Sequence, residues 1–84
     1  MQTLLELGAE VALRRRALGL KQGEVAARAG ISQDMLSRFE RGKAAEFGSR
    51  KLLAVLAVLG LELQFAPSGA SGSLDELRGE RGGP

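Results

Sequence analysis

Four glycines divide this chain into short segments, and their spacing limits the fold more than any other feature. Gly19, Gly30, Gly42 and Gly60 each follow a stretch whose apolar residues recur at helical spacing. Glycine often ends a helix, because it adopts the left-handed backbone conformation there at little cost. The sequence therefore predicts an all-α domain of four helices. These helices cover about residues 3–18, 22–29, 33–41 and 50–60.

The residues at the start of three of these segments favour helix initiation. Thr3 has Glu6 three residues later, which is the pattern of a capping box. Ser32 and Ser49 stand before the third and fourth segments. A serine hydroxyl accepts a hydrogen bond from the free N–H groups of the first turn. We therefore expect these three hydroxyl side chains to act as N-caps.

The fourth segment is followed by a pattern of a different kind. Residues 52–59 are apolar on every side, so a helix there must be covered on most of its faces. Residues 61–65 then alternate apolar and polar, which predicts a short β-strand. We expect that strand to pair with its copy across the two-fold axis of a homodimer, with Leu61, Leu63 and Phe65 at the interface. Extended chain packed over the helices is the alternative.

The composition changes at Pro67. Residues 67–84 are rich in glycine and serine, and Leu74 and Leu77 are their only sizeable apolar side chains. A segment of this kind cannot bury enough apolar surface to fold alone. The sequence thus predicts a folded domain over 1–66 and a flexible tail over 67–84, although residues 74–78 could form one helical turn on a partner.

Composition excludes several functional classes. The chain has no cysteine and no histidine, which removes disulfides, thiolate metal sites and imidazole catalysis. The longest apolar run is too short to span a bilayer, and no basic stretch precedes an apolar run at the N-terminus. We expect a cytoplasmic protein that is not an enzyme, with no metal, cofactor, membrane or small-molecule substrate.

Charge is unevenly distributed along the chain. Residues 14–51 hold ten basic and four acidic residues, a net charge of +6, whereas the two flanking parts together hold two basic and six acidic residues, a net charge of −4. A basic middle suggests a surface for a polyanion, although a solvated face without special purpose would have the same composition.

The second and third predicted helices are joined through Gly30 and Ile31. Two short helices with so tight a turn form a helix-turn-helix, in which the second helix enters the major groove of DNA. Leu36 and Phe39 face inward on this helix. The outward residues are Ser32, Gln33, Asp34, Ser37, Arg38 and Arg41.

Two stretches resemble known families. The first comprises residues 19–22, Val25-Ala26, residues 29–33 and residues 36–43, and it resembles the Xre-type, phage-repressor-like helix-turn-helix family. The second comprises residues 46–48, Leu52-Leu53 and residues 59–63, followed by a loose tail, and it resembles HipB-like antitoxins. Together the resemblance covers about residues 7–66 and implies a lambda-repressor-like four-helix fold.

The resemblance assigns base reading to the start of the third helix. In that family the outward positions there contact bases, which here are Ser32, Gln33, Asp34 and Ser37, with Arg38 a further candidate. The chemistry is suitable, because glutamine pairs with adenine, aspartate accepts from cytosine and arginine reaches guanine or a phosphate. Any one of these side chains could instead be merely exposed.

Other basic and polar residues are assigned to the DNA backbone or to the core. The family's glutamine at the start of the second helix binds a phosphate and braces the next helix, and Gln22 matches it. Lys21, Arg41 and Lys43 are placed for phosphates, which position a protein without reading sequence.

Arg15 and Glu40 match a buried salt bridge of the family. Arg14 and Arg16, in contrast, are expected to be solvated or near phosphate. The chain departs from the family at Lys21, where a hydroxyl cap is usual, and Gly23 is a poor helix residue.

These observations predict a dimeric repressor that binds a palindromic operator in double-stranded DNA. The resemblance further implies the antitoxin of a toxin–antitoxin module, which represses its own operon and binds a HipA-like kinase toxin. The alternatives are a stand-alone Xre-type regulator without a toxin, and a protein-interaction module that uses this scaffold without DNA.

Overall fold

The protein was analysed as a computed structural model, which describes residues 3–67. It contains four α-helices: α1 (Leu4–Ala17), α2 (Gln22–Ala29), α3 (Gln33–Glu40) and α4 (Ser49–Val58). The predicted helices agree with these bounds to within two residues, which is the usual uncertainty of a helix end. Apart from Pro67, the predicted tail lies outside the described residues, as does the helical turn suggested for residues 74–78.

Local sequence signals set most of the helix ends. The four glycines that divide the sequence have positive φ angles of 71°, 74°, 73° and 69°, and each follows a helix. At the start of α1, the Thr3 hydroxyl accepts a hydrogen bond from the Glu6 amide, and the Glu6 carboxylate accepts one from the Thr3 amide. The Ser32 hydroxyl accepts a hydrogen bond from the Met35 amide at 3.1 Å. The predicted capping box and the predicted Ser32 cap are therefore confirmed.

The prediction that Ser49 caps α4 is wrong. Ser49 is the first residue of the helix, and Gly48 before it has the extended conformation of an N-cap, with φ −57° and ψ 143°. Because an N-cap residue must lie outside the helix, a serine that is already helical does not fill that position. The first turn of α4 has no side-chain cap and no acidic residue.

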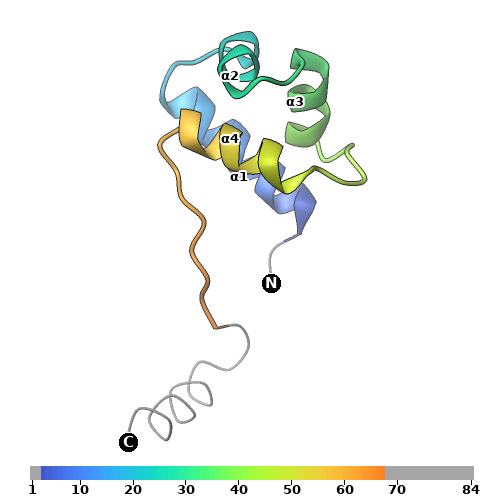
Figure 1. The fold of residues 1–84 in the computed structure, drawn as a ribbon, viewed down its shortest axis with the longest axis vertical. Coiled ribbons are helices and arrows are strands. Elements are labelled where there is room, and N and C mark those ends of the chain that lie inside the picture. Colours follow the sequence, from blue (N-terminus) through green and yellow to red (C-terminus); the bar gives the residue numbers. More distant parts are fainter. Residues whose placement is uncertain (1–2, 68–84) are drawn as a thin grey trace, which may run out of the picture.

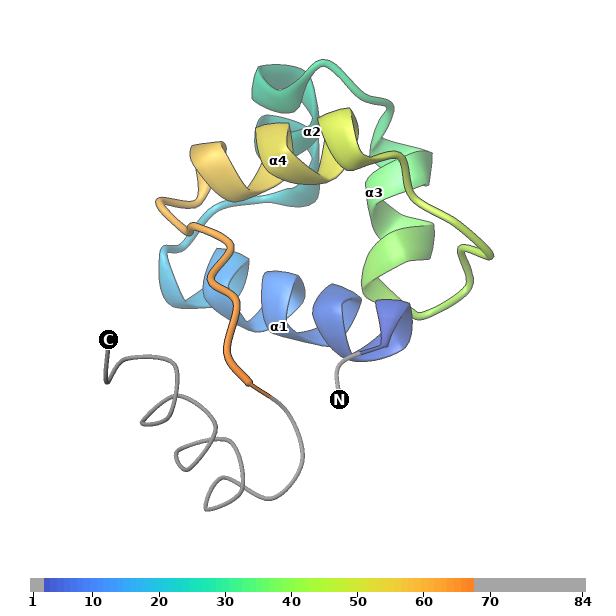
Figure 2. The same ribbon diagram turned by 60° about the horizontal axis from the view of Figure 1, so that its bottom comes forward.

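The helices enclose one core (Figure 2). Helix α3 packs against α1 and α2, and α4 packs against α2. The largest fully buried side chains come from all four helices and their ends: Phe39, Leu36, Leu59, Val11, Val25 and Val55. As predicted, Leu36 and Phe39 are the inward residues of α3, which fixes its opposite side toward solvent.

Residues 61–67 leave the end of α4 as extended chain, drawn in orange in Figure 1, and no strand is present among residues 3–67. Leu61 packs against the core, but Leu63 is 43% exposed and Phe65 is 98% exposed. Pairing between two copies stays a prediction, since a strand of this kind needs a second chain. Helix α4 is also incompletely covered, because Leu53 is half exposed.

Within the described part of the chain, no helix has the length and apolar character needed to cross a membrane.

Gly8 allows α3 to approach α1 closely. A side-chain carbon at this position would overlap the backbone carbonyl of Phe39 at the end of α3. We expect Gly8→Ala to lower the free energy of unfolding by about 1–3 kcal/mol, because backbone cannot move aside as a flexible side chain can. Gly23→Ala is the matched control, because Gly23 is also helical and a carbon added there would lie 3.4 Å from the flexible Gln33 side chain, an ordinary contact. Urea denaturation of both variants tests this prediction, and equal stabilities would contradict it.

Candidate nucleic-acid interface

A buried carboxylate joins the first three helices. Glu40, at the end of α3, is 8% exposed and accepts two hydrogen bonds from Arg15 of α1, at 2.7 Å to Oε2 and 2.8 Å to Oε1. Gln22, the first residue of α2, donates a third through its amide nitrogen at 2.8 Å. Arg15 also donates to the backbone carbonyl of Leu20. The ion pair expected from the resemblance is thus present, with Gln22 as an additional donor.

The surroundings of Glu40 keep it ionised. Burial by itself would raise the pKa of this carboxyl group. The hydrogen bonds from Arg15 and Gln22, together with the charges of Arg15 and Arg16, outweigh burial and lower the pKa. The hydrogen bond to Glu40 in turn raises the pKa of Arg15. Both groups therefore remain charged near neutral pH, as a bidentate ion pair requires.

The outward side of α3 is polar and open to solvent. Ser32, Gln33, Asp34 and Arg38 are exposed, while Ser37 is half-buried. The Ser32 hydroxyl oxygen accepts from the Met35 amide, which leaves its own hydrogen and one lone pair for a ligand. The sequence placed these five residues on one helix face, and the structure brings them together there.

Asp34 and Arg38 interact with each other on this face. The Arg38 Nε lies 3.3 Å from a carboxylate oxygen of Asp34, one helical turn earlier, and both side chains are more than half exposed. An exposed pair of this kind contributes little stability, so either group can exchange its partner for a ligand. Arg38 also offsets the negative charge that Asp34 would otherwise present to a polyanion.

An open polar hollow of about 570 Å³ lies beside the N-terminal ends of α2 and α3. Lys21, Gln22 and Gln33 line it. A carbon added at Gly23 would lie 3.4 Å from the Gln33 amide oxygen, which is an ordinary contact, so Gln33 does not require a glycine at this position. Gln22 also lines this hollow, and its amide nitrogen is bonded to Glu40, so it connects the start of α2 with the end of α3.

A second open hollow, of about 600 Å³, borders α3, the loop after it and the start of α4. Three cations, Arg38, Lys43 and Lys51, line it together with one anion, Glu46, and apolar residues that include Met35 and Phe47. Phe47 fixes this loop by stacking on Phe39, with ring centroids 4.1 Å apart. Sequence reasoning missed Lys51, because its proximity to α3 depends on how the loop folds. The available signal for a cationic surface there was that the start of α4 has no acidic residue.

Two other arginines make contacts that the sequence did not indicate. Arg14 was expected in solvent or near phosphate, but its Nε donates to the Leu59 carbonyl at 2.9 Å and so closes the end of α4. That expectation is wrong. The last carbonyls of a helix need hydrogen-bond donors, and Arg14 of α1 lies close enough to the end of α4 to donate to one of them. Arg41 is exposed, and its Nε lies 3.3 Å from the Ser37 carbonyl.

This arrangement has the geometry of a helix-turn-helix, with α2 braced by Gln22 and the polar face of α3 free. A family model for the helix-turn-helix domain matches residues 6–64. The chain belongs to this family. No curated protein matches the chain. The helix-turn-helix domain makes the protein a DNA-binding regulator, in agreement with the first of the two resemblances.

The buried ion pair predicts a specific dependence of stability on pH. Because the pKa of Glu40 is lower in the folded chain, its contribution is complete above the unfolded-state value of about 4.3 and is lost as the pH falls through the lower folded value. Glu40→Gln leaves Arg15 charged and without its anion, and we expect a loss of about 3 kcal/mol at pH 7. Denaturation between pH 7 and pH 3 should show the two proteins converging as the pH falls.

The exposed Glu46 provides the control for this experiment. Glu46→Gln should unfold like the natural chain at each pH. A Glu40→Gln protein as stable as the natural chain at pH 7 would show that this carboxylate does not hold the helices together.

Proposed function

We propose that this helix-turn-helix protein is a homodimeric repressor that binds a palindromic operator through α3 of each subunit. The observation that carries the proposal is the division of α3 into two sides. Leu36 and Phe39 are fully buried, while Gln33, Asp34 and Arg38 are exposed. The major groove is wide enough for one helix offered in this way.

In this proposal the polar face of α3 reads bases. The Gln33 side chain is exposed, so its amide is available to donate to and accept from an adenine edge. Ser32 and Ser37 can bond to several bases, and Arg38 can leave Asp34 for a guanine. Asp34 would then accept from a cytosine amino group.

The flanking residues contact phosphates. Lys21 lies at one hollow beside α3, and Lys43 and Lys51 lie at the other. Arg41 stands at the end of α3, and Gln22, already bonded to Glu40, can reach a phosphate with its remaining N–H. Cations at two hollows beside one helix match the two phosphate backbones that border a groove. Neutralising phosphates releases counterions, so binding should weaken as salt is added.

The antitoxin role rests on the resemblance of residues 46–63 to HipB-like proteins. We propose that the protein represses its own operon and binds a HipA-like kinase toxin. Co-expression with the kinase-like product of a neighbouring gene tests this: a stable complex supports the antitoxin role, whereas separate elution of the two proteins favours a stand-alone Xre-type regulator.

Two alanine substitutions should separate base reading from phosphate binding. Gln33→Ala should weaken binding to the operator by about 1–3 kcal/mol and leave binding to random DNA nearly unchanged. Arg41→Ala should weaken both alike and reduce the salt dependence by about one unit per subunit. Gel-shift titrations at several salt concentrations provide both measurements. Equal losses of Gln33→Ala on the two DNAs would remove Gln33 from the base-reading set, and absence of binding at low salt would favour a protein-interaction module.

Leu63→Asp should convert the dimer to monomers. Leu63 is 43% exposed in one chain, so the substitution should not unfold the domain, but it places two carboxylates at the two-fold axis. Leu13→Asp is the control, because Leu13 is an exposed leucine of α1. Sedimentation of both variants decides the matter, and a Leu63→Asp protein that stays dimeric would show that residues 61–65 are not the interface.

A further inference from the structure

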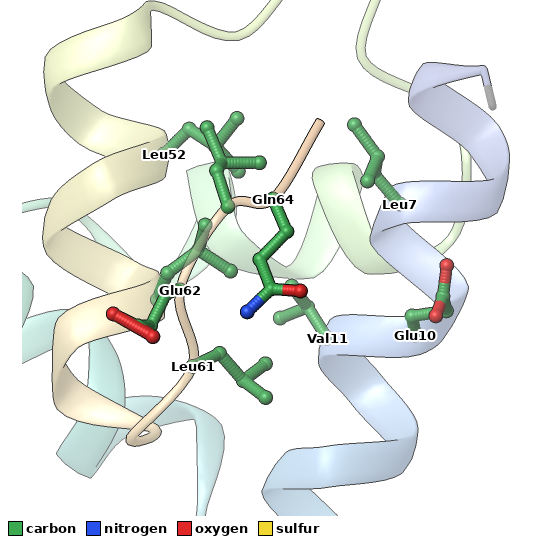
Figure 3. A pocket seen from close by; sticks show the side chains of 9 residues that line it. Leu7, Glu10, Val11, Leu52, Leu61, Glu62 and Gln64 are labelled. Carbon is green, nitrogen blue, oxygen red and sulfur yellow. The ribbon is translucent and has the colours of Figure 1, made fainter. Parts of the chain in front are cut away.

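An apolar groove lies between α1 and α4, below the extended segment that follows α4 (Figure 3). It is lined by six apolar residues, Leu7, Val11, Leu52, Leu56, Leu61 and Leu63, and by three polar ones, Glu10, Glu62 and Gln64. Its volume is about 270 Å³, slightly below the range of small-molecule sites and suited to one large side chain. In the single chain the polar side chain of Gln64 lies over it (Figure 3), and an amide is a poor match for leucines.

Phe65 is the most exposed large apolar side chain among residues 3–67. The other two phenylalanines of the chain, Phe39 and Phe47, stack on each other, whereas Phe65 is 98% exposed. It follows Gln64 in the extended segment, and it is not among the residues that line the groove of its own chain. The groove and the ring therefore each lack a suitable partner within one copy.

Symmetry restricts how two copies of residues 61–65 can pair. In an antiparallel pair, two residues that lie opposite each other point to the same face of the sheet. The two-fold axis keeps each residue and its copy on the same face, so a residue can lie opposite only the copy of a residue an even number of positions away. One residue, the centre of the pair, must therefore lie opposite its own copy. Centring on Gln64 would bring Pro67 opposite Leu61, and proline has no N–H to donate. Centring on Glu62 would draw in Leu59 and Gly60, whose amides belong to the last turn of α4. Leu63 is left as the centre.

Hydrogen bonding agrees with this register. The Leu61 amide already donates to the Leu56 carbonyl at 2.8 Å, so Leu61 belongs to a pair without ladder hydrogen bonds. Pairs alternate along an antiparallel ladder. Leu63 would then lie opposite its copy in a pair without ladder hydrogen bonds. The ladder hydrogen bonds would join Glu62 of one copy to Gln64 of the other. In this register Phe65 of one copy lies opposite Leu61 of the other, and Leu61 lines the groove.

We propose that Phe65 of each copy packs into the groove between α1 and α4 of the other copy, in a strand pair centred on Leu63. This inference rests on the proposed homodimer and specifies the residue that crosses the interface. Filling two grooves with two rings would also cover Leu52 of α4, which is only half-buried in a single chain.

The chain contains no tryptophan, so Phe65→Trp gives a single fluorescent reporter at the crossing position. Its emission should be blue-shifted at concentrations where sedimentation finds a dimer, and should move to the red on dilution to monomers. Leu13→Trp is the control on the exposed side of α1, and it should emit in the red at all concentrations. Phe65→Ala should raise the dissociation constant of the dimer roughly a hundredfold, about tenfold for each ring.

The chain also lacks cysteine, so Leu63→Cys tests the register separately. Residues opposed across a non-bonded pair are about 4.5 Å apart at Cα, within disulfide range. Disulfide-linked dimers of Leu63→Cys together with a blue-shifted tryptophan support the inference. Linked dimers whose tryptophan stays in water, or a blue shift that is already present in monomers, would overturn the inference about Phe65. Neither result would contradict the homodimer itself. Monomers at all concentrations would refute the homodimer itself.

Discussion

The carboxylate of Glu40 is the contact on which the rest of this structure depends. It lies where α1, α2 and α3 meet, and its three hydrogen bonds come from Arg15 and Gln22 on the other two helices. A charge removed from water is costly unless it is paired and fully hydrogen-bonded. The ion pair therefore favours the arrangement in which Arg15 and Gln22 both reach this carboxylate.

The position of Glu40 on α3 connects stability with DNA binding. The same eight-residue helix carries Leu36 and Phe39 toward the core, Glu40 at its end and the polar side chains Gln33, Asp34 and Arg38 toward solvent. Three contacts hold it from behind: the core, the buried ion pair and the ring of Phe47 on Phe39. A helix held in this way presents its outer face with little freedom to move, which is what reading base edges requires.

Much of this architecture could be predicted from sequence because its signals are local. Glycines at helix ends, the capping box of Thr3 and Glu6, and the inward pair Leu36 and Phe39 each act within a few residues. The missed features depend on contacts between distant segments. Arg14 reaches a carbonyl 45 residues away, and Lys51 approaches α3 only because Phe47 fixes the intervening loop. Ser49 failed as a cap because the helix begins one residue earlier than its hydroxyl suggested.

The central claim is that the polar face of α3 lies in the major groove of DNA, once in each subunit. Methylation protection with dimethyl sulfate on the DNA upstream of the gene tests it most directly, because this reagent modifies guanine N7 in the major groove and adenine N3 in the minor groove. The account predicts protection of guanine N7 in two half-sites about one helical turn apart, with adenine N3 between them still reactive. Bound DNA in which guanine N7 remains fully reactive, or in which only adenine N3 is protected, would contradict it.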